Sequence, residues 1–364
     1  MHDPHDIDRL TASYAYDLPP ELIAHHPADV RDHARLMVVP KTGPYEHRHF
    51  SDIGEYLRPG DCLVLNDTRV IPARLFGVKA NGTAKVELLL LRCLHDTTWR
   101  VLVRPGRRVR PGHRVIIEPG VLEATVDDVE PGGERIVTFT CDGDFMELVA
   151  RYGHVPLPPY IHETLKDPER YQTVYARHPG SVAAPTAGLH FTPELLDTLQ
   201  ADGIAIARLT LHVGLGTFRT VDEPAITDHA MHTEAYVLDA DAASTIERTR
   251  REGGRVIAVG TTSCRTLEAV AAEQETNLCR GRLAPASGET NLFIYPGYTF
   301  RLTDAMITNF HLSKSTLLML VSALMGRTRM LDAYRVAIER RYRFYSFGDA
   351  MLLLPHEHGE GELP

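Results

Sequence analysis

The segment RVIAVGTTSCRTLEAVAAE, residues 255–273, has the pattern of one buried strand followed by one helix. The apolar run RVIAVG (255–260) has the length of a strand that is covered on both faces, and CRTLEAVAAE (264–273) spaces its apolar residues as a helix does. A strand that leads directly into a helix is typical of a mostly parallel sheet whose strands are joined by right-handed helical crossovers. The segment therefore predicts an α/β domain.

The same alternation of strand and helix continues on both sides of this segment. Buried or half-buried strands are predicted at DCLVLN (61–66), IAIARLTLHVG (204–214), NLFIY (291–295) and AMITNF (305–310). Helices are predicted at 241–252, at STLLMLVSALM (315–325) and at LDAYRVAIERRY (331–342). Most of the second half of the chain thus belongs to the α/β domain.

A different pattern occupies residues 70–149. Short apolar runs such as KVELLLL, WRVLV and RIVTF alternate there with turns such as Asn81-Gly82, Pro119-Gly120 and Asp142-Gly143. Many short strands with frequent turns favour an antiparallel barrel or sandwich. We therefore predict a discontinuous, mostly parallel α/β domain (1–66 and 150–364) with an inserted antiparallel β-barrel domain (67–149). Residues 1–12 and 356–364 are predicted to be disordered tails.

Composition bounds the class of protein. The 364 residues include 43% hydrophobic and 24% charged residues, with a net charge of −9, so a basic field over the whole protein is absent. No apolar run reaches the roughly 20 residues of a membrane span, and the acidic start is unlike a secretory signal. The five scattered cysteines include no CxxC pair, which disfavours a disulfide framework or a thiolate zinc site. We expect a cytoplasmic protein that contacts no membrane.

Polar loops follow several of the predicted strands, where α/β sheets bind their ligands. Gly260, Thr261, Thr262 and Ser263 form a strand-to-helix turn that suits an anion or is an ordinary helix cap. Lys314 stands at another helix start, but the residue before it is Ser313 instead of the glycine of an ATP-binding phosphate loop. LHVGLGTFR (211–219) adds His212, Gly214, Gly216 and Phe218, and PTAGLHF (185–191) adds His190 and Phe191.

The segment ITDHAMHTEAY (226–236) brings Asp228, His229, His232 and Glu234 within seven positions. These are metal-ligating residue types, but only a helical segment would place both histidines on one face. Hydrogen bonding to other site residues and general base catalysis are the other interpretations. We expect no metal here.

Several stretches, taken in order, resemble the S-adenosylmethionine:tRNA ribosyltransferase-isomerase family of the queuosine pathway. They include YDLPPELIAHHPADVRDHARLMVV (16–39), LNDTRVIPARLFG (65–77), GSVAAPTAGLHFTPELL (180–196), VIAVGTTSCRTLE (256–268), ITNFHLSKSTLLMLVSA (307–323) and YRFYSFGDAMLL (342–353). The resemblance extends from about Tyr14 to Leu354. The chain departs from the family pattern at Thr220, Cys264 and Ser313, where the family usually has Pro, Val and Pro.

The resemblance implies a particular reaction. The ribosyl part of S-adenosylmethionine, a co-substrate, is transferred to 7-aminomethyl-7-deazaguanine at the wobble position of the tRNAs for Tyr, His, Asn and Asp. The product is epoxyqueuosine in the anticodon loop, and adenine and methionine leave. The resemblance also implies an α/β domain with an inserted barrel. We expect a monomer.

This reaction assigns candidate roles to the polar loops. The sulfonium acidifies the neighbouring 5′ carbon, so a base and an acid are needed near the ribose, and His190, His212, His232 and Glu234 are the candidates. Phe191, Phe218 and Phe310 are candidates for the wall facing the sulfonium. The methionine carboxylate or a phosphate would be held by Lys314, by Arg265 or by the turn 260–263. Gly214 and Gly216 would allow the backbone to approach the ligand closely. For RNA, the candidates are Arg69, Arg74, Arg104, Arg107 and Arg108.

Other classes remain open from the residues alone. A metal-dependent hydrolase would use the 226–236 segment, and a paralogue would act on a free deazaguanine instead of tRNA. A methyltransferase fits less well, because no glycine-rich loop follows the first strand. A non-catalytic RNA-binding module does not explain so many polar loops at strand ends.

Overall fold

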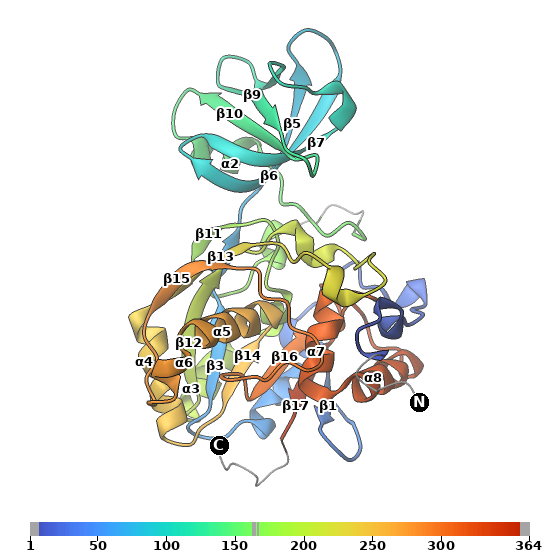
Figure 1. Cartoon of the computed structure of the whole chain (residues 1–364), viewed down its shortest axis with the longest axis vertical. Helices are drawn as coiled ribbons and strands as arrows, with labels where there is room; N and C mark the ends of the chain where they lie inside the picture. Colours follow the sequence, from blue (N-terminus) through green and yellow to red (C-terminus); the bar gives the residue numbers. More distant parts are fainter. Residues whose placement is uncertain (1–6, 162–164, 166, 357–364) are drawn as a thin grey trace. The chain divides into compact units, whose positions relative to one another are not determined.

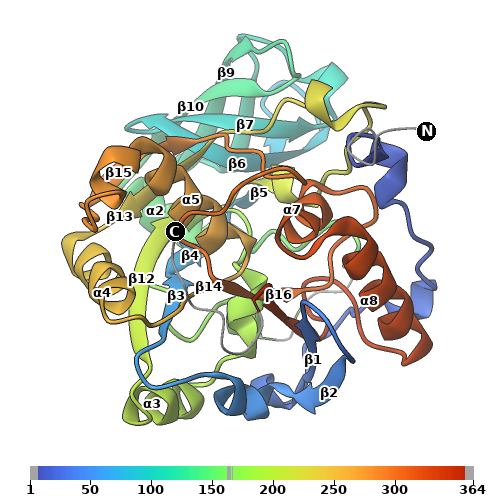
Figure 2. The same ribbon diagram turned by 60° about the horizontal axis from the view of Figure 1, so that its bottom comes forward.

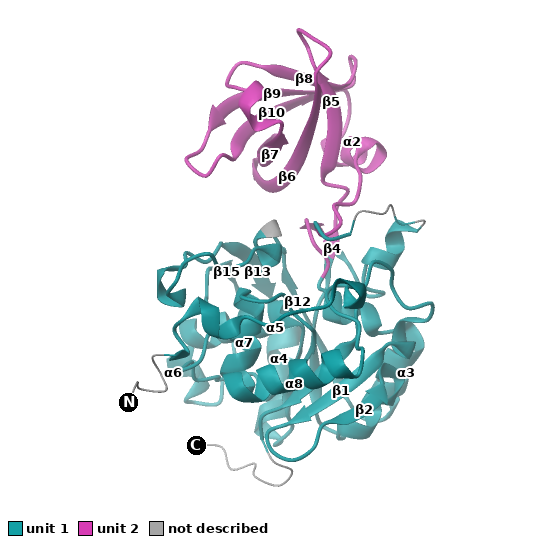
Figure 3. Cartoon of the chain, turned by 90° about the vertical axis from the view of Figure 1, so that its right-hand side faces the viewer, with its two compact units in different colours: residues 1–68, 159–178, 185–364 teal, residues 69–158, 179–184 magenta. Residues whose placement is uncertain are grey.

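The structure is a computed structural model, and it describes residues 7–161, 165 and 167–356. The chain divides into two compact units (Figure 3), with residues 69–158 and 179–184 in unit 2 and the remainder in unit 1. Unit 1 holds a mixed α/β sheet and unit 2 holds a closed antiparallel barrel, so the predicted fold class is confirmed. The predicted domain boundaries at 66/67 and 149/150 stay a prediction.

Unit 1 is built on a nine-stranded sheet with the order β15-β13-β12-β3-β14-β16-β17-β1-β2 (Figures 1 and 2). The strands are β1 (Arg35–Pro40), β2 (Glu46–His49), β3 (Cys62–Asn66), β12 (Ala205–Leu211), β13 (Glu234–Leu238), β14 (Val256–Val259), β15 (Ala286–Thr290), β16 (Ala305–Asn309) and β17 (Ala350–Leu354). The central strands β12, β3, β14 and β16 run parallel, whereas β13, β15 and β2 join antiparallel at the edges. β17 runs antiparallel to β16 and parallel to β1.

The central strands are buried on both faces, as their continuous apolar sequences predict. Every residue of β3, β14, β16 and β17 is buried. Alternate residues such as Leu63 and Leu65 face a core that includes Phe50 and Phe191, and the next residues along each strand face the opposite side. Burial on both sides explains why these strands read as apolar runs without alternation.

Seven α-helices, together with short 3₁₀ helices, connect the described strands. They are α2 (Phe145–Tyr152), α3 (Pro193–Ala201), α4 (Ala240–Arg251), α5 (Thr261–Glu273), α6 (Glu275–Leu278), α7 (Thr316–Met325) and α8 (Arg327–Glu339). Side chains cap several of them: Thr192 accepts from the Leu195 N–H (3.1 Å), and Ser315 accepts from the Leu318 N–H (3.2 Å). α4 and α5 lie against β12, β3 and β14.

The barrel of unit 2 closes in the order β10-β7-β6-β5-β8-β9, with all neighbours antiparallel. Its strands are β5 (Arg74–Lys79), β6 (Lys85–His95), β7 (Thr98–Arg104), β8 (Arg114–Glu118), β9 (Leu122–Val129) and β10 (Arg135–Cys141). The ring of Phe145, in α2, packs 4.9 Å from Phe139 and 5.8 Å from Trp99, measured between centroids. A separate two-stranded sheet joins β4 (Thr68–Val70) to β11 (His178–Ser181).

The strand predicted at 291–295 was wrong. The sheet strand is β15, which ends at Thr290, and residues 291–295 have no strand structure. The Leu292 N–H donates to Oγ1 of Thr290 (3.1 Å) and its carbonyl accepts from Nε of Arg265 (3.1 Å). Side chains therefore take the backbone groups that a strand would use in its ladder.

The structure describes only part of the two predicted tails. Residues 1–6 and 357–364 of the predicted disordered tails lie outside the described residues. Residues 7–12 differ from that expectation, because Thr11 is buried and Leu10 forms a bridge with Ala225. Among the described residues, no helix is both long enough and apolar enough to cross a membrane.

Candidate functional site

The carboxyl ends of four neighbouring strands meet at one edge of the sheet in unit 1. Because β12, β3, β14 and β16 run parallel, their last residues Leu211, Asn66, Val259 and Asn309 point the following loops to the same side. β17 starts at this edge, since it runs antiparallel to β16. Ligands bind at such an edge in open α/β sheets, so the loops that leave these strands form the candidate site.

The Asn66 side chain forms hydrogen bonds with three of these loops. This fully buried side chain donates from Nδ2 to the Leu211 carbonyl (3.0 Å) and to Oγ1 of Thr262 (3.2 Å). Its Oδ1 accepts the N–H groups of Leu211 (3.0 Å) and Thr68 (3.2 Å). A buried amide with both ends satisfied holds its partners in place. Asn66 therefore positions the loops after β3 and β12 and the start of α5.

His212 stands at the end of β12 with one ring nitrogen held. Its Nδ1 lies 2.9 Å from Oγ1 of Thr68, and its backbone N–H donates to the Ala235 carbonyl (3.0 Å). Burial, and then the charge of His178, lowers the pKa of His212, while Asp67 opposes the shift. The ring is therefore mainly neutral at pH 7, which is the form that accepts a proton.

Glu234 and Arg265 form a buried ion pair beside the loop after His212. The Arg265 guanidinium donates to Oε2 of Glu234, and both side chains are at most 4% exposed. Oε1 accepts the Gly214 N–H (2.9 Å) and lies 3.2 Å from Nε2 of His232. Burial alone would raise the pKa of Glu234, but Arg265, His232 and the Gly214 N–H hold it at about 2. Glu234 is therefore ionised at pH 7, and its contacts favour an anchoring role over proton transfer.

The two glycines of the 211–219 segment have different neighbours. A Cβ on Gly216 would lie 2.4 Å from Nδ1 of His232, so the imidazole packs directly on this backbone. A Cβ on Gly214 would meet only Oε1 of Glu234, at 3.8 Å. Gly216 is thus required for the position of His232, whereas Gly214 contributes its N–H.

The turn 260–263 begins α5. Gly260 adopts φ +87°, a conformation that glycine adopts without strain. Oγ of Ser263 donates to the Val259 carbonyl (2.9 Å), and Oγ1 of Thr262 accepts from Asn66. The Ser263 O–H is therefore used inside the protein, whereas the backbone N–H groups of the first helical turn are suited to donate to a ligand anion.

His190 lies on the other side of the site, next to the end of β16. Its Nε2 is 3.3 Å from Nδ2 of Asn309, whose Oδ1 accepts from Oγ1 of Thr186 (2.9 Å). Burial lowers the pKa of His190 to about 4. An imidazole that accepts from an amide and is this hard to protonate is held neutral.

The other sequence-predicted residues of unit 1 are dispersed. Phe191 is fully buried with its ring centroid 4.9 Å from that of Phe50, and Phe310 is fully buried 4.8 Å from Phe344. The faces of both rings are therefore occupied by protein. Phe218 is half-buried, with its centroid 6.2 Å from that of Tyr160. Lys314 is exposed and has φ +58°.

The RNA candidates lie in unit 2. Nε of Arg74 pairs with Glu87 (3.2 Å), and Arg69 is half-buried. Arg104, the last residue of β7, is exposed, as are Arg107 and Arg108 on the loop between β7 and β8, and no carboxylate of the described residues lies within 4 Å of them. Buried Val109 and a hydrogen bond from Arg135 to the Gly106 carbonyl (2.8 Å) anchor this loop.

The 226–236 segment does not gather into one cluster. Nδ1 of His229 pairs with Oε2 of Glu223 (3.0 Å), whereas His232 pairs with Glu234. No set of three metal-ligating side chains suited to an ion occurs within residues 7–161 and 167–356.

Asn66, Thr68 and Asn309 were not among the site residues predicted from the sequence. Asn66 and Asn309 are polar residues at the ends of apolar strands, and the strand DCLVLN is followed at once by Asp67 and Thr68. Asp67 also belongs to this group, because its Oδ1 accepts from Oγ1 of Thr210 (2.7 Å). The strand-end criterion, applied to the strands predicted at 61–66 and 305–310, would have identified Asn66 and Asn309, and with Asn66 the neighbouring Asp67 and Thr68.

Fold and site together define an α/β protein with polar loops at one edge of its sheet and an inserted barrel, the architecture that the resemblance implies for the enzyme family. A family model described as "Queuosine biosynthesis protein" matches residues 11–353. The chain belongs to this family.

Curated relatives agree over nearly the whole length. The S-adenosylmethionine:tRNA ribosyltransferase-isomerase of Symbiobacterium thermophilum is 55% identical over 344 residues, covering 94% of this chain and 99% of the relative. That of Acetivibrio thermocellus is 52% identical, with 94% and 99% covered. A crystal structure of S-adenosylmethionine tRNA ribosyltransferase from Thermotoga maritima is 40% identical with a TM-score of 0.54, covering 94% of this chain and 100% of that one. These names do not favour the alternative of a metal-dependent hydrolase.

Proposed function

We propose that this chain transfers the ribosyl moiety of S-adenosylmethionine to 7-aminomethyl-7-deazaguanine at the wobble position of tRNA. The product is epoxyqueuosine in tRNA, with release of adenine and methionine. The observation that carries the proposal is the likeness, at 52–55% identity over 94% of the chain, to relatives named S-adenosylmethionine:tRNA ribosyltransferase-isomerase.

The loops after β12 and β3 supply the base in this proposal. The sulfonium of S-adenosylmethionine makes the neighbouring 5′ hydrogens acidic, so a neutral imidazole at the ribose can remove one. His212 has this protonation state, because burial lowers its pKa, and Oγ1 of Thr68 fixes the ring at 2.9 Å from Nδ1. We assign His212 as the general base, with Thr68 and Asn66 as positioning residues.

The pair Glu234–Arg265 holds the opposite part of the co-substrate. Nη2 of Arg265 is buried and has no hydrogen-bond partner among the described residues, although Nη1 pairs with Glu234. A carboxylate that reaches Nη2 would gain a charge-assisted hydrogen bond. Arg265 and the first turn of α5 therefore suit the methionine carboxylate, while His232, set between Gly216 and Glu234, is the candidate acid.

The barrel contributes to RNA binding in this proposal. Arg104 at the end of β7, with Arg107 and Arg108 in the loop after it, forms an exposed cationic group with no carboxylate partner in the described part of the chain, and phosphates bind such groups. We further propose that the substrates are the tRNAs for Tyr, His, Asn and Asp, that the protein is cytoplasmic, and that it acts as a monomer. Light scattering during size-exclusion chromatography tests the last point.

The reaction is tested with an anticodon stem-loop that carries 7-aminomethyl-7-deazaguanine. The RNA is incubated with protein and S-adenosylmethionine, its mass is measured, and adenine and methionine are quantified in the same tube. We expect epoxyqueuosine and one adenine per product. A methyl-sized mass gain, or turnover of the free base but not of the RNA, would contradict the proposal.

A further inference from the structure

Unit 1 contains a small pocket that no step of the proposed reaction uses. Three arginines line it, Arg31, Arg170 and Arg343, together with buried His190 and half-buried Ala28. All three arginines are half-buried. Arginines that converge on one hollow from three distant parts of the chain require a physical explanation, because their charges repel.

Backbone carbonyls hold each guanidinium in place. Arg31 donates to the carbonyls of Leu189 and Glu169, both at 3.0 Å. Arg170 donates to the Asp29 carbonyl (3.1 Å) and to the Ala28 carbonyl. Carbonyls orient these planar groups without neutralising them, so the positive charge is retained.

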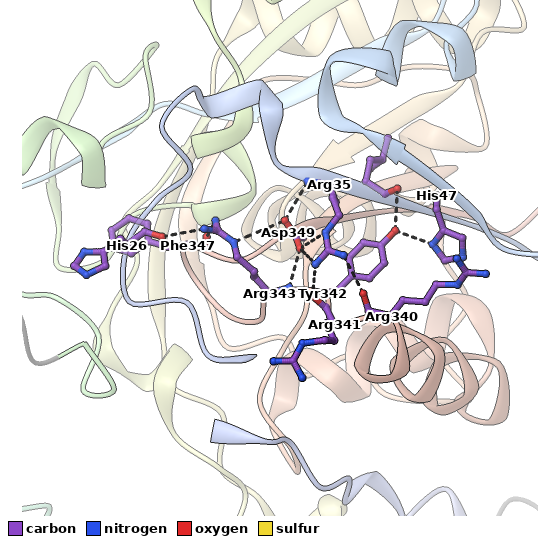
Figure 4. Close-up of polar contacts among 10 residues, drawn as sticks. His26, Arg35, His47, Arg340, Arg341, Tyr342, Arg343, Phe347 and Asp349 are labelled. Atoms are coloured by element: carbon purple, nitrogen blue, oxygen red, sulfur yellow. Dashed lines mark hydrogen bonds and ion pairs between the residues drawn. The ribbon is translucent and has the colours of Figure 1, made fainter. Parts of the chain in front are cut away.

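Arg343 is held in the same way, as Figure 4 shows. It donates from Nη2 to the Phe347 carbonyl (2.5 Å) and from Nη1 to the His26 carbonyl (3.5 Å). Its backbone N–H donates to Asp349 (2.7 Å), while the guanidinium stays 3.9 Å from that carboxylate.

Among the described residues, one carboxylate lies within 4 Å of a guanidinium of the pocket: Oδ1 of Asp349 is 3.9 Å from Nε of Arg343. Asp349 is engaged by Nε (3.1 Å) and Nη2 (2.9 Å) of Arg35, which lies outside the pocket lining. Within the described part of the chain, no carboxylate oxygen lies within 4 Å of the guanidinium nitrogens of Arg31 or Arg170. Burial and the charge of Arg170 lower the pKa of Arg31, against the opposing effect of Asp167 and Glu169. Among the described residues, the three arginines of the pocket therefore outnumber the carboxylates close to them.

The pocket also belongs to the edge of the sheet where the candidate site lies. His190, in its wall, contacts Asn309 at the end of β16 (3.3 Å), and Arg343 contacts Asp349, which precedes β17. An anion bound there would be adjacent to whatever occupies the strand ends.

We propose that this arginine pocket, defined by Arg31, Arg170 and Arg343, binds a backbone phosphate of the substrate RNA and so positions the modified nucleotide. The proposal rests on the proposed function. Arginine forks match the geometry of phosphate oxygens. The methionine end of S-adenosylmethionine fits less well, because its ammonium group would face three cations, and the one carboxylate near them in the described part of the chain, Asp349, is already engaged by Arg35.

The test places a negative charge in the pocket without removing an arginine. Ala28→Glu puts a carboxylate among the three guanidinium groups, and Ala28→Gln is its control of equal size without the charge. The affinity for the stem-loop is measured over a range of salt concentrations, together with the affinity for S-adenosylmethionine and the product formed by the wild type.

Ala28→Glu is expected to weaken RNA binding about ten-fold, the effect of losing one charge-assisted hydrogen bond. The slope of log K against log salt should fall by about 0.7, the value for one phosphate contact in single-stranded RNA. Ala28→Gln should match the wild type, and the affinity for S-adenosylmethionine should not change in either variant.

Equal RNA affinities of the two variants would overturn the proposal. So would a loss confined to S-adenosylmethionine binding, which would assign the pocket to the methionine carboxylate. If Ala28→Glu does not fold, Arg170→Lys and Arg170→Gln give the same comparison, with the salt slope kept by Lys and reduced by Gln. Failure of the wild type to form product would contradict the proposed function, whereas the comparison of variants tests the pocket alone.

Discussion

Replacing Glu234 by Gln should remove one charge from the buried pair with Arg265. Their side chains are 2% and 4% exposed, so water cannot replace the lost carboxylate. Gln keeps the size of the side chain and can still accept the Gly214 N–H, so the change isolates the charge. Breaking a buried pair on one side leaves an uncompensated charge in a medium of low polarity, which is strongly destabilising.

The pKa of Glu234 indicates the size of the effect. It falls from 4.5 to about 2 on folding, which corresponds to about 3 kcal/mol of stability at pH 7. Because the pKa is lowered, this stability is fully present above pH 4.5 and is lost as the pH falls toward 2. The difference between wild type and Glu234→Gln should therefore be largest at pH 7 and should shrink below pH 4.5.

The assay is urea unfolding followed by circular dichroism at several pH values. Glu275→Gln is the control, since Glu275 is 67% exposed and lies 3.6 Å from Arg301, where an ion pair contributes about 0–1 kcal/mol. Adding Arg265→Met to Glu234→Gln should recover part of the loss, because no unpaired charge remains. If Glu234→Gln is as stable as the wild type at pH 7, the reasoning is refuted.

Three further changes test the site and the barrel loop. Gly216→Ala should displace His232, whose Nδ1 would lie 2.4 Å from the new Cβ, and should lower kcat/KM about 100-fold. Gly82→Ala is the control and should have no effect on kcat/KM, because its Cβ would meet no atom within 4 Å. His212→Gln should lower kcat by about 10²- to 10⁴-fold and leave the RNA affinity unchanged. Because the base must be neutral and the pKa of His212 is lowered, wild-type kcat/KM should fall only as the pH drops below 6.5. A fall in kcat/KM that begins above pH 6.5 on acidification would contradict this. Arg107→Ser should reduce the slope of log K against log salt for RNA binding by about 0.7 to 0.9. Arg114→Ser is the control and should change this slope less, because Arg114 is already paired with Glu123. Identical slopes for the two variants would contradict RNA binding by the loop between β7 and β8.

Much of the fold was predictable from local pattern. The apolar strands 61–66, 204–214, 255–260 and 305–310 and the helices at 241–252 and 315–325 were found within a few residues of their ends. They were recognisable because burial on both faces demands continuous apolar sequence. Residues 291–295 were wrongly predicted as a strand because this segment is also a short apolar run. Its backbone groups at Leu292 bind the side chains of Thr290 and Arg265 instead of a neighbouring strand.

The site was only partly predictable. His212, His232, Glu234 and Arg265 were all named as candidates, but not that Glu234 and Arg265 pair with one another. Phe191 and Phe310 were expected at a ligand, and the structure buries both in cores. Sequence identifies a residue's chemistry, whereas its exposure depends on what packs against it from elsewhere in the chain.

The sequence by itself determined the strand–helix alternation of the α/β domain, the short strands and frequent turns of the barrel, the strand ends where polar residues gather, and the family. These features depend on residue types and on their spacing along the chain. The tertiary structure decided the partners of those residues. Asn66 meets Thr262, Glu234 meets Arg265, and Arg31, Arg170 and Arg343 line one pocket, in each case across many residues of chain. Such contacts depend on the fold, which brings segments that are distant in the sequence to one edge of the sheet. Burial and neighbouring charges there then set the protonation state of Glu234 and of the histidines.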